Sequence, residues 1–290
     1  MERAITLSPS RARRWIRCKR SYYWRYERHL NKVRKDMPPT LGLVVGKTLE
    51  GYYKLEATQR SQESILKLLN LTLTSWKPRF LKDKDQEKDW QKIVGISTAL
   101  ITKYHAWVEQ KDNFKVLETE TTHEVEIAPG IWLLAIPDAV VETEGSKLIL
   151  EHKVRYRYRT GDFGVDYQAP ACCLVTESIG TLFNVLEYSH GKLIREPIIR
   201  SEHELAYFKE IFISIAHDII STCLRSRWSP YEFYHMPMKR CTCEYWELCN
   251  AEIQGLDIDD IVSELYINTH AIPHEGDTKE TEVEGTQEAI

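Results

Sequence analysis

The fold of this chain can be predicted from the stretch Ile136-Pro-Asp-Ala-Val-Val-Glu-Thr-Glu-Gly-Ser-Lys-Leu-Ile-Leu-Glu-His-Lys153. Two runs of apolar residues, 131–141 and 148–154, flank a polar connection over residues 142–147 that contains a glycine. Apolar runs of this length joined by a short polar turn are typical of a β-hairpin. The sequence therefore predicts two paired strands at the centre of a sheet.

The predicted hairpin brings charged side chains together at one of its ends. Because side chains alternate between the two faces of a strand, Glu151 and Lys153 share one face and His152 points to the other. Asp138 lies on the partner strand. Two carboxylates and an amine suit a divalent metal ion and a phosphodiester, because hard oxygen ligands hold Mg²⁺ or Mn²⁺. The alternative is a solvated strand edge with an incidental ion pair.

Asp138, preceded by proline, and the later Glu151-His152-Lys153 resemble the core signature of the PD-(D/E)xK nuclease superfamily. Within it, the chain resembles the RecB-like branch that includes the Cas4 and AddB-type nucleases, over most of residues 5–250. The resemblance implies an α/β fold, a mixed central β-sheet flanked by helices. It also implies that Asp138, Glu151 and the backbone carbonyl of His152 bind metal, and that Lys153 is the catalytic lysine.

Two flanking motifs follow the order of this family. Gly46 to Glu50 resembles its Gly-x-x-x-His motif, with Glu50 in place of histidine, which implies Glu50 as a further metal ligand. Glutamate is a hard donor that suits Mg²⁺, although an ordinary exposed helix residue remains the alternative. Gln168 and Cys172 occupy the Gln-x-x-x-Tyr motif. Gln168 is thus expected to orient the lysine or contact DNA, and Cys172 stands where the motif has tyrosine.

The second group of candidate functional residues consists of clustered cysteines. Seven cysteines, no signal peptide and no apolar run long enough for a bilayer predict a reducing cytoplasm without structural disulfides. Cys241, Cys243 and Cys249 lie within nine residues, and thiolates this close are more stable when a metal neutralises their repulsion. Metal binding is therefore the leading role for these three, and a fourth ligand is required.

Cys18 is the candidate for that fourth ligand. Residues 7–26 resemble the amino-terminal segment of iron-sulfur RecB-like nucleases, in which one cysteine here and three near the carboxyl terminus bind a [4Fe-4S] cluster. Only one residue separates Cys241 from Cys243, so zinc, a different cluster or no metal remains an alternative. The other thiols are expected to be buried small hydrophobes: Cys172, Cys173 and Cys223.

The same amino-terminal segment is rich in arginine and aromatic residues. Ser8 is a good N-cap and Pro9 suits the first helical position, so a helix is predicted to run through Arg20. Guanidinium groups bind phosphates and aromatic rings stack on exposed bases, which suits a single-stranded or frayed DNA end. The alternative is that the aromatics fill the core. The residues predicted to contact DNA are Arg11, Arg14, Arg17 and Tyr167.

The remaining segments define the predicted domain organisation. A helical subdomain over about residues 52–114 is inserted into a nuclease domain of residues 1–255, and residues 82–92 form a charged loop within it. A carboxyl-terminal extension (256–269) and an acidic, disordered tail (270–290) follow. Helices are predicted over 166–178 and 202–224, and strands over 181–188 and 192–198.

Taken together, these features predict a Mg²⁺- or Mn²⁺-dependent deoxyribonuclease. The resemblance implies an exonuclease acting on DNA ends or single strands in recombination, repair or the processing of phage or foreign DNA. The expected location is the cytoplasm of a prokaryote, or of the host cell for a phage-encoded protein. DNA is the expected partner and a membrane is not, whereas homo-oligomers and recombination or CRISPR-type partner proteins stay open. The alternative is a catalytically silent relative that binds DNA or a partner through a structural metal cluster.

Overall fold

The computed structural model describes residues 4–33, 37–81, 86–164, 166–225 and 243–268. The chain divides into two compact units, the first formed by residues 1–9 and 34–214 and the second by residues 10–33 and 215–290. No helix within the described ranges is long and apolar enough to cross a membrane. Three features predicted above lie outside the described residues: Cys241, the tail 270–290 and the side chain of Cys223.

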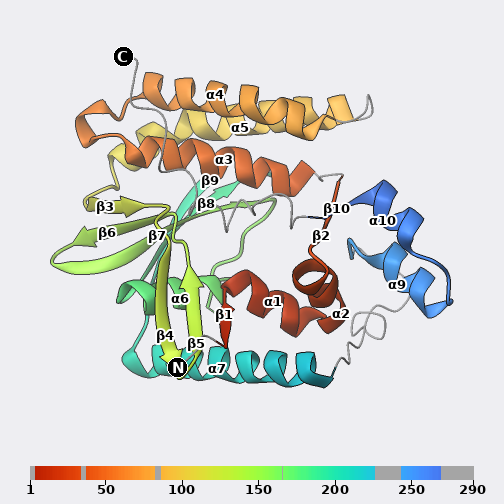
Figure 1. Ribbon diagram of the computed structural model, residues 1–290. Helices are drawn as coiled ribbons and strands as arrows, with labels where there is room; N and C mark the ends of the chain where they lie inside the picture. Colours follow the sequence, from red (N-terminus) through yellow and green to blue (C-terminus); the bar gives the residue numbers. More distant parts are fainter. Residues whose placement is uncertain (1–3, 34–36, 82–85, 165, 226–242, 269–290) are drawn as a thin grey trace, which may run out of the picture. The chain divides into compact units, whose positions relative to one another are not determined.

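The first unit is built on a mixed sheet, which Figure 1 shows beneath a layer of helices. Among the described residues this sheet contains, in spatial order, β3 (Lys115–Thr119), β6 (Ala139–Thr143), β7 (Ser146–Arg155), β8 (Gly180–Glu187) and β9 (Lys192–Ile199). Neighbouring strands are antiparallel except β7 and β8, which are parallel. The predicted α/β fold with a mixed central sheet is therefore confirmed.

The hairpin of β6 and β7 is confirmed, and its turn is tighter than the sequence predicts. Thr143 pairs with Ser146, which leaves only Glu144 and Gly145 in the connection. Both residues have positive φ angles, 49° and 75°. Two positive φ angles define the type I′ turn, whose twist matches that of the flanking strands. Glycine at the second position supplies that backbone conformation without steric cost.

The apolar run 131–141 is not one strand, and the prediction of a single strand there was wrong. Residues Ile131–Ala135 form β5, which pairs with β4 (His123–Ala128) and with β1 (Ile5–Leu7) in a separate sheet. The chain leaves this sheet at Ile136 and Pro137 and enters β6 at Ala139. Proline carries no backbone N–H for a strand ladder, so it marks the point at which the chain changes sheets.

Helices α3 (Met37–Lys54), α4 (Gln62–Phe80) and α5 (Gln86–Glu109) cover one face of the mixed sheet, as Figure 1 shows. The helical character predicted for residues 52–114 is confirmed up to Glu109, where α5 ends. The prediction of a loop over 82–92 was wrong from Gln86 onward. Gln86 and Trp90 are buried in the first turns of α5, so two buried side chains fix this charged segment as a helix.

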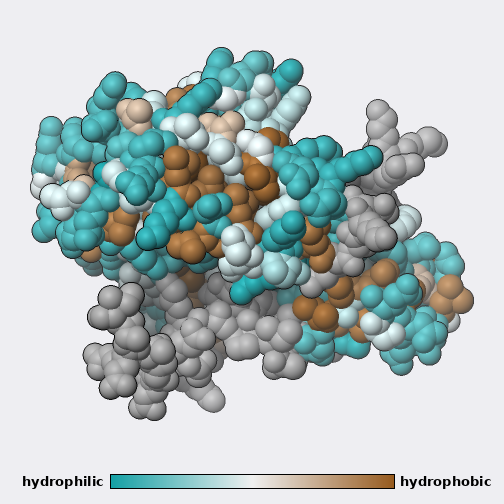
Figure 2. All heavy atoms as spheres, turned by 90° about the horizontal axis from the view of Figure 1, so that it is seen from above, coloured by the Kyte–Doolittle hydropathy of each residue, from teal (hydrophilic) through white to brown (hydrophobic). Residues whose placement is uncertain are grey.

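The helical layer is amphipathic and encloses the main core. Its inner side packs against Val141, Leu148 and Leu150 of the hairpin. Figure 2 views the layer from outside, where hydrophilic side chains border a hydrophobic stretch in the middle. Leu43 and Leu71 are exposed hydrophobic residues of α3 and α4. Leu148 and Leu150 face the helices. Because side chains alternate along a strand, Glu151 lies on the opposite face of β7.

The connection from β7 to β8 contains α6 (Gln168–Thr176), which packs against both strands. This helix, strands β8 and β9 and the later α7 (Glu202–Arg225) agree with their predicted ranges to within about two residues. Strands β3 and β4, over residues 115–128, add to the predicted architecture. Their alternating exposed and half-buried side chains carry only a weak apolar signal.

The second unit combines residues 10–33 with residues from 215 onward. Its helices are α1 (Pro9–Arg17), α2 (Lys19–Tyr22), α9 (Trp246–Ile253) and α10 (Asp259–Leu265), with a π-helical turn at Tyr23–Glu27 and paired strands β2 (Leu30–Lys32) and β10 (Tyr266–Asn268). The prediction of one continuous helix through Arg20 was wrong. Cys18 is extended, with φ −165°, and its sulfur accepts the N–H of Ser21 as the cap of α2.

Candidate active site

Strand register places Asp138 beside Glu151. Ala139 pairs with Leu150, so the residue before β6 lies next to the residue after Leu150 on β7. The carboxylate of Asp138 accepts a hydrogen bond from the backbone N–H of His152, with 2.7 Å between Oδ2 and N. The switch between sheets at Pro137 thus ends with a carboxylate fixed against the centre of the hairpin.

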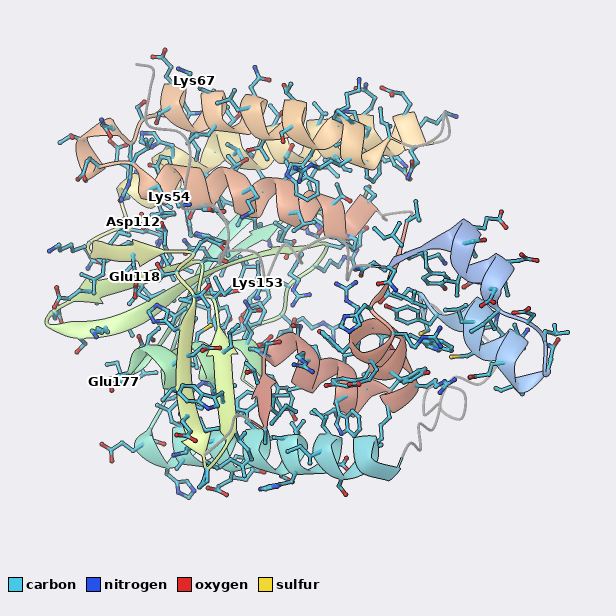
Figure 3. All side chains as sticks on the ribbon, viewed as in Figure 1. Lys54, Lys67, Asp112, Glu118, Lys153 and Glu177 are labelled. Atoms are coloured by element: carbon cyan, nitrogen blue, oxygen red, sulfur yellow. The ribbon has the colours of Figure 1, made fainter. Side chains whose placement is uncertain are left out.

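Glu151, Lys153 and Gln168 form a closed triangle of hydrogen bonds. Lys153 Nζ lies 2.6 Å from Glu151 Oε1 and 2.8 Å from Gln168 Oε1. The amide nitrogen of Gln168 donates to the same Glu151 oxygen at 2.8 Å. Figure 3 shows Lys153 on β7, below the helical layer that carries Lys54. The structure therefore brings together the predicted lysine, one predicted metal ligand and the predicted orienting glutamine.

Gln168 is held by the geometry of the α6 amino terminus. It is the first residue of α6, and its backbone N–H donates to Asp166 Oδ1 at 2.6 Å. One turn later, Cys172 stands where the family motif has tyrosine. The thiol is buried, and burial raises its pKa, with further upward shifts from the nearby charge of Glu151. Cys172 and Cys173 are therefore the buried small residues that the sequence predicts.

Burial and like charge perturb both acids of the site. Burial raises the pKa of Asp138 to about 6, and the charges of Glu120 and Glu50 contribute in the same direction. Burial also raises the pKa of Glu151, with Asp138 adding to the shift. Burial alone would lower the pKa of Lys153, but Glu151 and Asp138 hold it above its ordinary value. The site therefore contains an excess of buried negative charge over positive charge.

A cation would relieve that excess, and one oxygen is placed for it. Oε1 of Glu151 accepts from both Lys153 and Gln168, whereas Oε2 is buried with no hydrogen-bond partner in the described structure. A buried carboxylate oxygen without a partner is costly unless an ion or a water completes it. Among the described residues, however, no three His, Cys, Asp or Glu side chains already stand in a metal-binding group. These oxygen donors suit a hard divalent ion, but in this structure they do not surround a common position.

Both carboxylate oxygens of Glu50 are engaged by lysine side chains, which accounts for part of this open arrangement. Its carboxylate lies in α3 between Lys47 Nζ, at 2.7 Å from Oε2, and Lys54 Nζ, at 2.5 Å from Oε1. Burial alone would raise its pKa, but the two lysines lower it overall. Glu50 therefore stays ionised within electrostatic range of Asp138, with both oxygens engaged by ammonium groups. As a metal ligand it would have to exchange one of these partners.

Glu120 is an acidic neighbour of the site that sequence reasoning missed. It follows β3 with a left-handed φ of 51°, and its backbone N–H donates to the carbonyl of Asp138 at 3.1 Å. Its charge contributes to the raised pKa of Asp138. A glutamate at the end of a polar edge strand gives no signal in the sequence. Only the pairing of β3 with β6 brings it to the site.

The side chain of His152 lies on the opposite face of β7, as alternation predicts. Its ring stacks on Tyr53 of α3, with 5.3 Å between centroids, and meets Tyr104 of α5 edge to face. Burial lowers the pKa of His152 to about 3, assisted by the charges of Arg195 and Lys153. The imidazole is therefore neutral at physiological pH. Only the backbone of His152 faces the acids.

A closed hydrogen-bond network supports that face of the strand. Tyr53 OH bonds to Tyr104 OH at 3.0 Å and donates to Asp112 at 2.8 Å. Asn184 donates to Tyr104 OH and accepts from Arg195, whose second nitrogen reaches Asp112 at 2.6 Å. The five side chains thus close a ring that links α3, α5, β8 and β9 behind the β6–β7 hairpin.

Three of the four predicted cluster cysteines, Cys18, Cys243 and Cys249, belong to the described part of the second unit, and there they do not stand in a metal-binding group. Cys18 and Cys249 are both buried, and Trp24 Nε1 donates to the sulfur of Cys249 at 3.3 Å. Burial raises the pKa of Cys249 to about 11, and the charge of Cys18 adds to that shift. Cys243 packs at the edge of the core that contains Cys249. Thiols from both the beginning and the end of the predicted nuclease domain therefore belong to one unit.

The predicted DNA-contacting residues differ in how far they are engaged within the protein. Arg14 donates to Ser21 and to Glu244, the latter at 2.6 Å. Arg11 donates to Tyr22 OH, and Arg17 is exposed at the end of α1. In the first unit, Tyr167 lies half-buried, with its ring edge to face against Phe208 and Phe212. Their DNA contacts stay predictions.

Asp138 before β6, the Glu151-x-Lys153 pair on β7 and Gln168 on α6 thus lie together, as the resemblance to the nuclease family predicts. The chain matches the family described as "PD-(D/E)XK nuclease superfamily" over residues 6–250. It therefore belongs to the PD-(D/E)XK nuclease superfamily, and it is a nuclease by family. No curated protein matches the chain.

Two solved structures are similar to parts of this chain. A protein from Eubacterium rectale, described as a "Putative exonuclease", is 10% identical with a TM-score of 0.48, covering 83% of this chain and 92% of its own. The structure described as "Crystal structure of SSO0001" is 14% identical with a TM-score of 0.34, covering 72% of this chain and 76% of its own. Both likenesses span most of each chain.

Proposed function

We propose that this protein is a Mg²⁺- or Mn²⁺-dependent deoxyribonuclease that acts as an exonuclease on DNA ends or single strands. The observation that carries the proposal is the triangle of Glu151, Lys153 and Gln168 beside Asp138. A divalent ion held by Asp138, Glu151 and the carbonyl of His152 would supply Lewis-acid stabilisation and an activated water. The unpartnered oxygen of Glu151 supports this ligand role.

Lys153, Gln168 and Glu50 then have separate roles in hydrolysis. The ammonium of Lys153 lies where negative charge builds on the scissile phosphate, and a fixed cation in a buried site stabilises such charge strongly. Gln168 accepts from that ammonium and so fixes its direction. Glu50 is proposed as a further metal ligand, released from Lys47 or Lys54 when it binds. Recombination, repair or phage DNA processing stays the proposed context.

Cleavage of end-labelled single- and double-stranded DNA tests this proposal. We expect Mg²⁺ or Mn²⁺ to support cleavage and EDTA to abolish it. Because burial and Asp138 raise the pKa of Glu151 to about 8, protons compete with the metal, so less metal is needed for half-maximal rate as pH rises from about 6 to 8. The charge of Lys153 lowers the pKa of this carboxyl group, and the charge of Asp166 raises it.

The outcome separates the candidate functions. DNA binding without any cleavage, at all metal concentrations and pH values, would support the catalytically silent relative. Cleavage confined to internal sites of closed circular DNA would contradict the exonuclease part of the proposal alone.

For the second unit we propose a [4Fe-4S] cluster held by Cys18, Cys241, Cys243 and Cys249. The burial of Cys18 and Cys249 in the same unit and the Trp24 N–H bond to the Cys249 sulfur support it, because hydrogen bonds to the sulfurs tune such clusters. Zinc remains the alternative for the same thiols.

Replacing Cys249 with serine should remove the cluster. We expect anaerobically purified Cys249→Ser protein to lose the broad visible absorption and the bound iron of the wild type, since one of four thiolates is missing. Cys173→Ser is the matched control, because Cys173 is a buried thiol of the first unit beside Thr181. Zinc in place of iron in the wild-type protein would contradict the iron-sulfur proposal.

A further inference from the structure

Residues 156–164 form a loop that folds back onto the face of the sheet that carries Glu151 and Lys153. Phe163 is buried and stacks on Phe183 of β8, with 4.3 Å between centroids and 13° between planes. Phe183 pairs in register with Glu151, so both side chains lie on the same face. Tyr158 stacks on the outer side of Phe163 at 5.3 Å. Three stacked rings therefore hold the loop next to the active site.

Acidic side chains fix the backbone of this loop. Glu187 Oε2 accepts the N–H of Tyr158 at 3.0 Å, and Glu196 Oε1 accepts the N–H of Gly161 at 3.1 Å. Buried Arg200 donates from the other side to the carbonyls of Phe163 and Gly164, at 3.4 and 3.2 Å. Hydrogen bonds from charged groups are stronger than neutral ones, so the loop conformation is set before any ligand arrives.

The outward side of the loop is basic and aromatic. Arg155, Arg157 and Arg159 are exposed, and no carboxylate of the described residues forms an ion pair with them. The ring of Tyr156 is 59% exposed, with the Arg157 guanidinium 5.7 Å from its centroid. Tyr188 supports the same ring edge to face at 5.4 Å. Positive charge and an open aromatic ring are thus presented together.

The basic and aromatic residues of this surface lie at the carboxyl end of β7 and directly after it in the chain. Glu151, Lys153 and Arg155 lie two residues apart on β7, so they share a face with about 7 Å between successive Cα atoms. A DNA strand that runs along β7 with its scissile phosphate at Lys153 would meet Arg155 next, and then the loop. Phosphates bind guanidinium groups, and bases stack on exposed aromatic rings without regard to sequence.

We propose that residues 155–159 form a platform for single-stranded DNA beside the active site. Arg155, Arg157 and Arg159 bind successive phosphates, and Tyr156 stacks on an unpaired base. This inference rests on the proposed nuclease function and extends it, because it assigns the path of the strand as it enters or leaves the catalytic centre. The stacking contact favours single strands, since the bases of a duplex already stack on each other.

Fluorescence anisotropy of a labelled oligothymidylate with the full-length protein in EDTA tests the platform without cleavage. We expect Tyr156→Ala to weaken binding by about tenfold, since one base–aromatic stack is lost. Arg157→Ala should reduce the salt slope of log Kd by about 0.7, whereas Arg157→Lys should retain the slope because the charge remains. The affinity for a blunt duplex of the same length should change less in Tyr156→Ala.

Two matched variants control for general surface effects. Tyr207 is a 63% exposed tyrosine on α7, and Lys67 is an exposed cation on α4, labelled in Figure 3. Tyr207→Ala and Lys67→Ala should bind the oligonucleotide as the wild type does. Wild-type affinity in Tyr156→Ala, or the same loss in Tyr207→Ala, would overturn the platform.

The failure of the platform and the failure of the nuclease proposal give different results. Hydrolysis of a small activated phosphodiester by the wild-type protein with Mn²⁺ reports the chemistry alone, since such a substrate has no second phosphate or base. Hydrolysis together with unaltered DNA binding by Tyr156→Ala overturns only the platform. No hydrolysis of this substrate or of DNA, together with weakened binding by Tyr156→Ala, overturns the nuclease proposal and supports a single-strand binding surface.

Discussion

Lys153→Ala should lower the single-turnover rate of metal-dependent DNA cleavage by about 10²–10³-fold, the loss typical of one preorganised charged donor. The ammonium is held in place by Glu151 and Gln168, so alanine removes both the charge and the group that those side chains orient. DNA binding should change little, because the phosphate contacts of the exposed arginines remain. Radiolabelled or fluorescent end-labelled DNA measures the rate.

The folded state of this variant needs its own control. Removing Lys153 leaves Glu151 buried without its cation, but a buried carboxyl with a raised pKa can take up a proton instead. We therefore expect a circular dichroism melting curve close to that of the wild type at about pH 6. Wild-type cleavage rates in the purified, folded Lys153→Ala protein would contradict the catalytic assignment.

Arg195→Ala should lower the free energy of unfolding by about 3–5 kcal/mol, the range for breaking a buried ion pair from one side. The guanidinium side chain is only 12% exposed and lies 2.6 Å from Asp112, whose side chain is 14% exposed. It also bonds to Asn184 and lies over the rings of Trp107 and Phe114. Alanine leaves Asp112 with a buried negative charge. Urea denaturation followed by circular dichroism measures the loss.

A double-mutant cycle separates the ion pair from the packing. In Arg195→Ala combined with Asp112→Asn, no uncompensated carboxylate remains, so the combined loss should be smaller than the sum of the two single losses. Strictly additive losses, or a loss below about 1 kcal/mol in Arg195→Ala, would show that the network behind His152 carries little of the stability.

The faces on which Glu151, His152 and Lys153 lie could be predicted from the sequence, because they depend only on local alternation. In a strand of known direction, Glu151, Lys153 and His152 have no other arrangement, and the structure confirms it. Gln168 was found by resemblance to a family motif, and its contact with Lys153 follows from the placement of α6. Local patterns of this kind are set by backbone geometry and do not require the rest of the fold.

Features that depend on distant segments could not be predicted in this way. The run 131–141 is continuously apolar, and nothing in its hydrophobicity shows that β5 joins a different sheet from β6. Glu120 approaches Asp138 only because β3 pairs with β6. Residues 86–92 read as a solvated charge run, although two buried side chains make them part of α5. In each case a long-range contact overrode the local signal.

The change of sheets at Pro137 has a consequence for the entropy of metal binding. Strand β5 is paired up to Ala135 and strand β6 from Ala139, so Asp138 is tethered on both sides by ladders of separate sheets. A residue anchored on both sides has already lost its backbone freedom during folding. If Asp138 binds a cation as proposed, its backbone therefore needs little further ordering. The entropic cost of fixing the backbone of Asp138 is thus incurred when the protein folds and not when a cation binds.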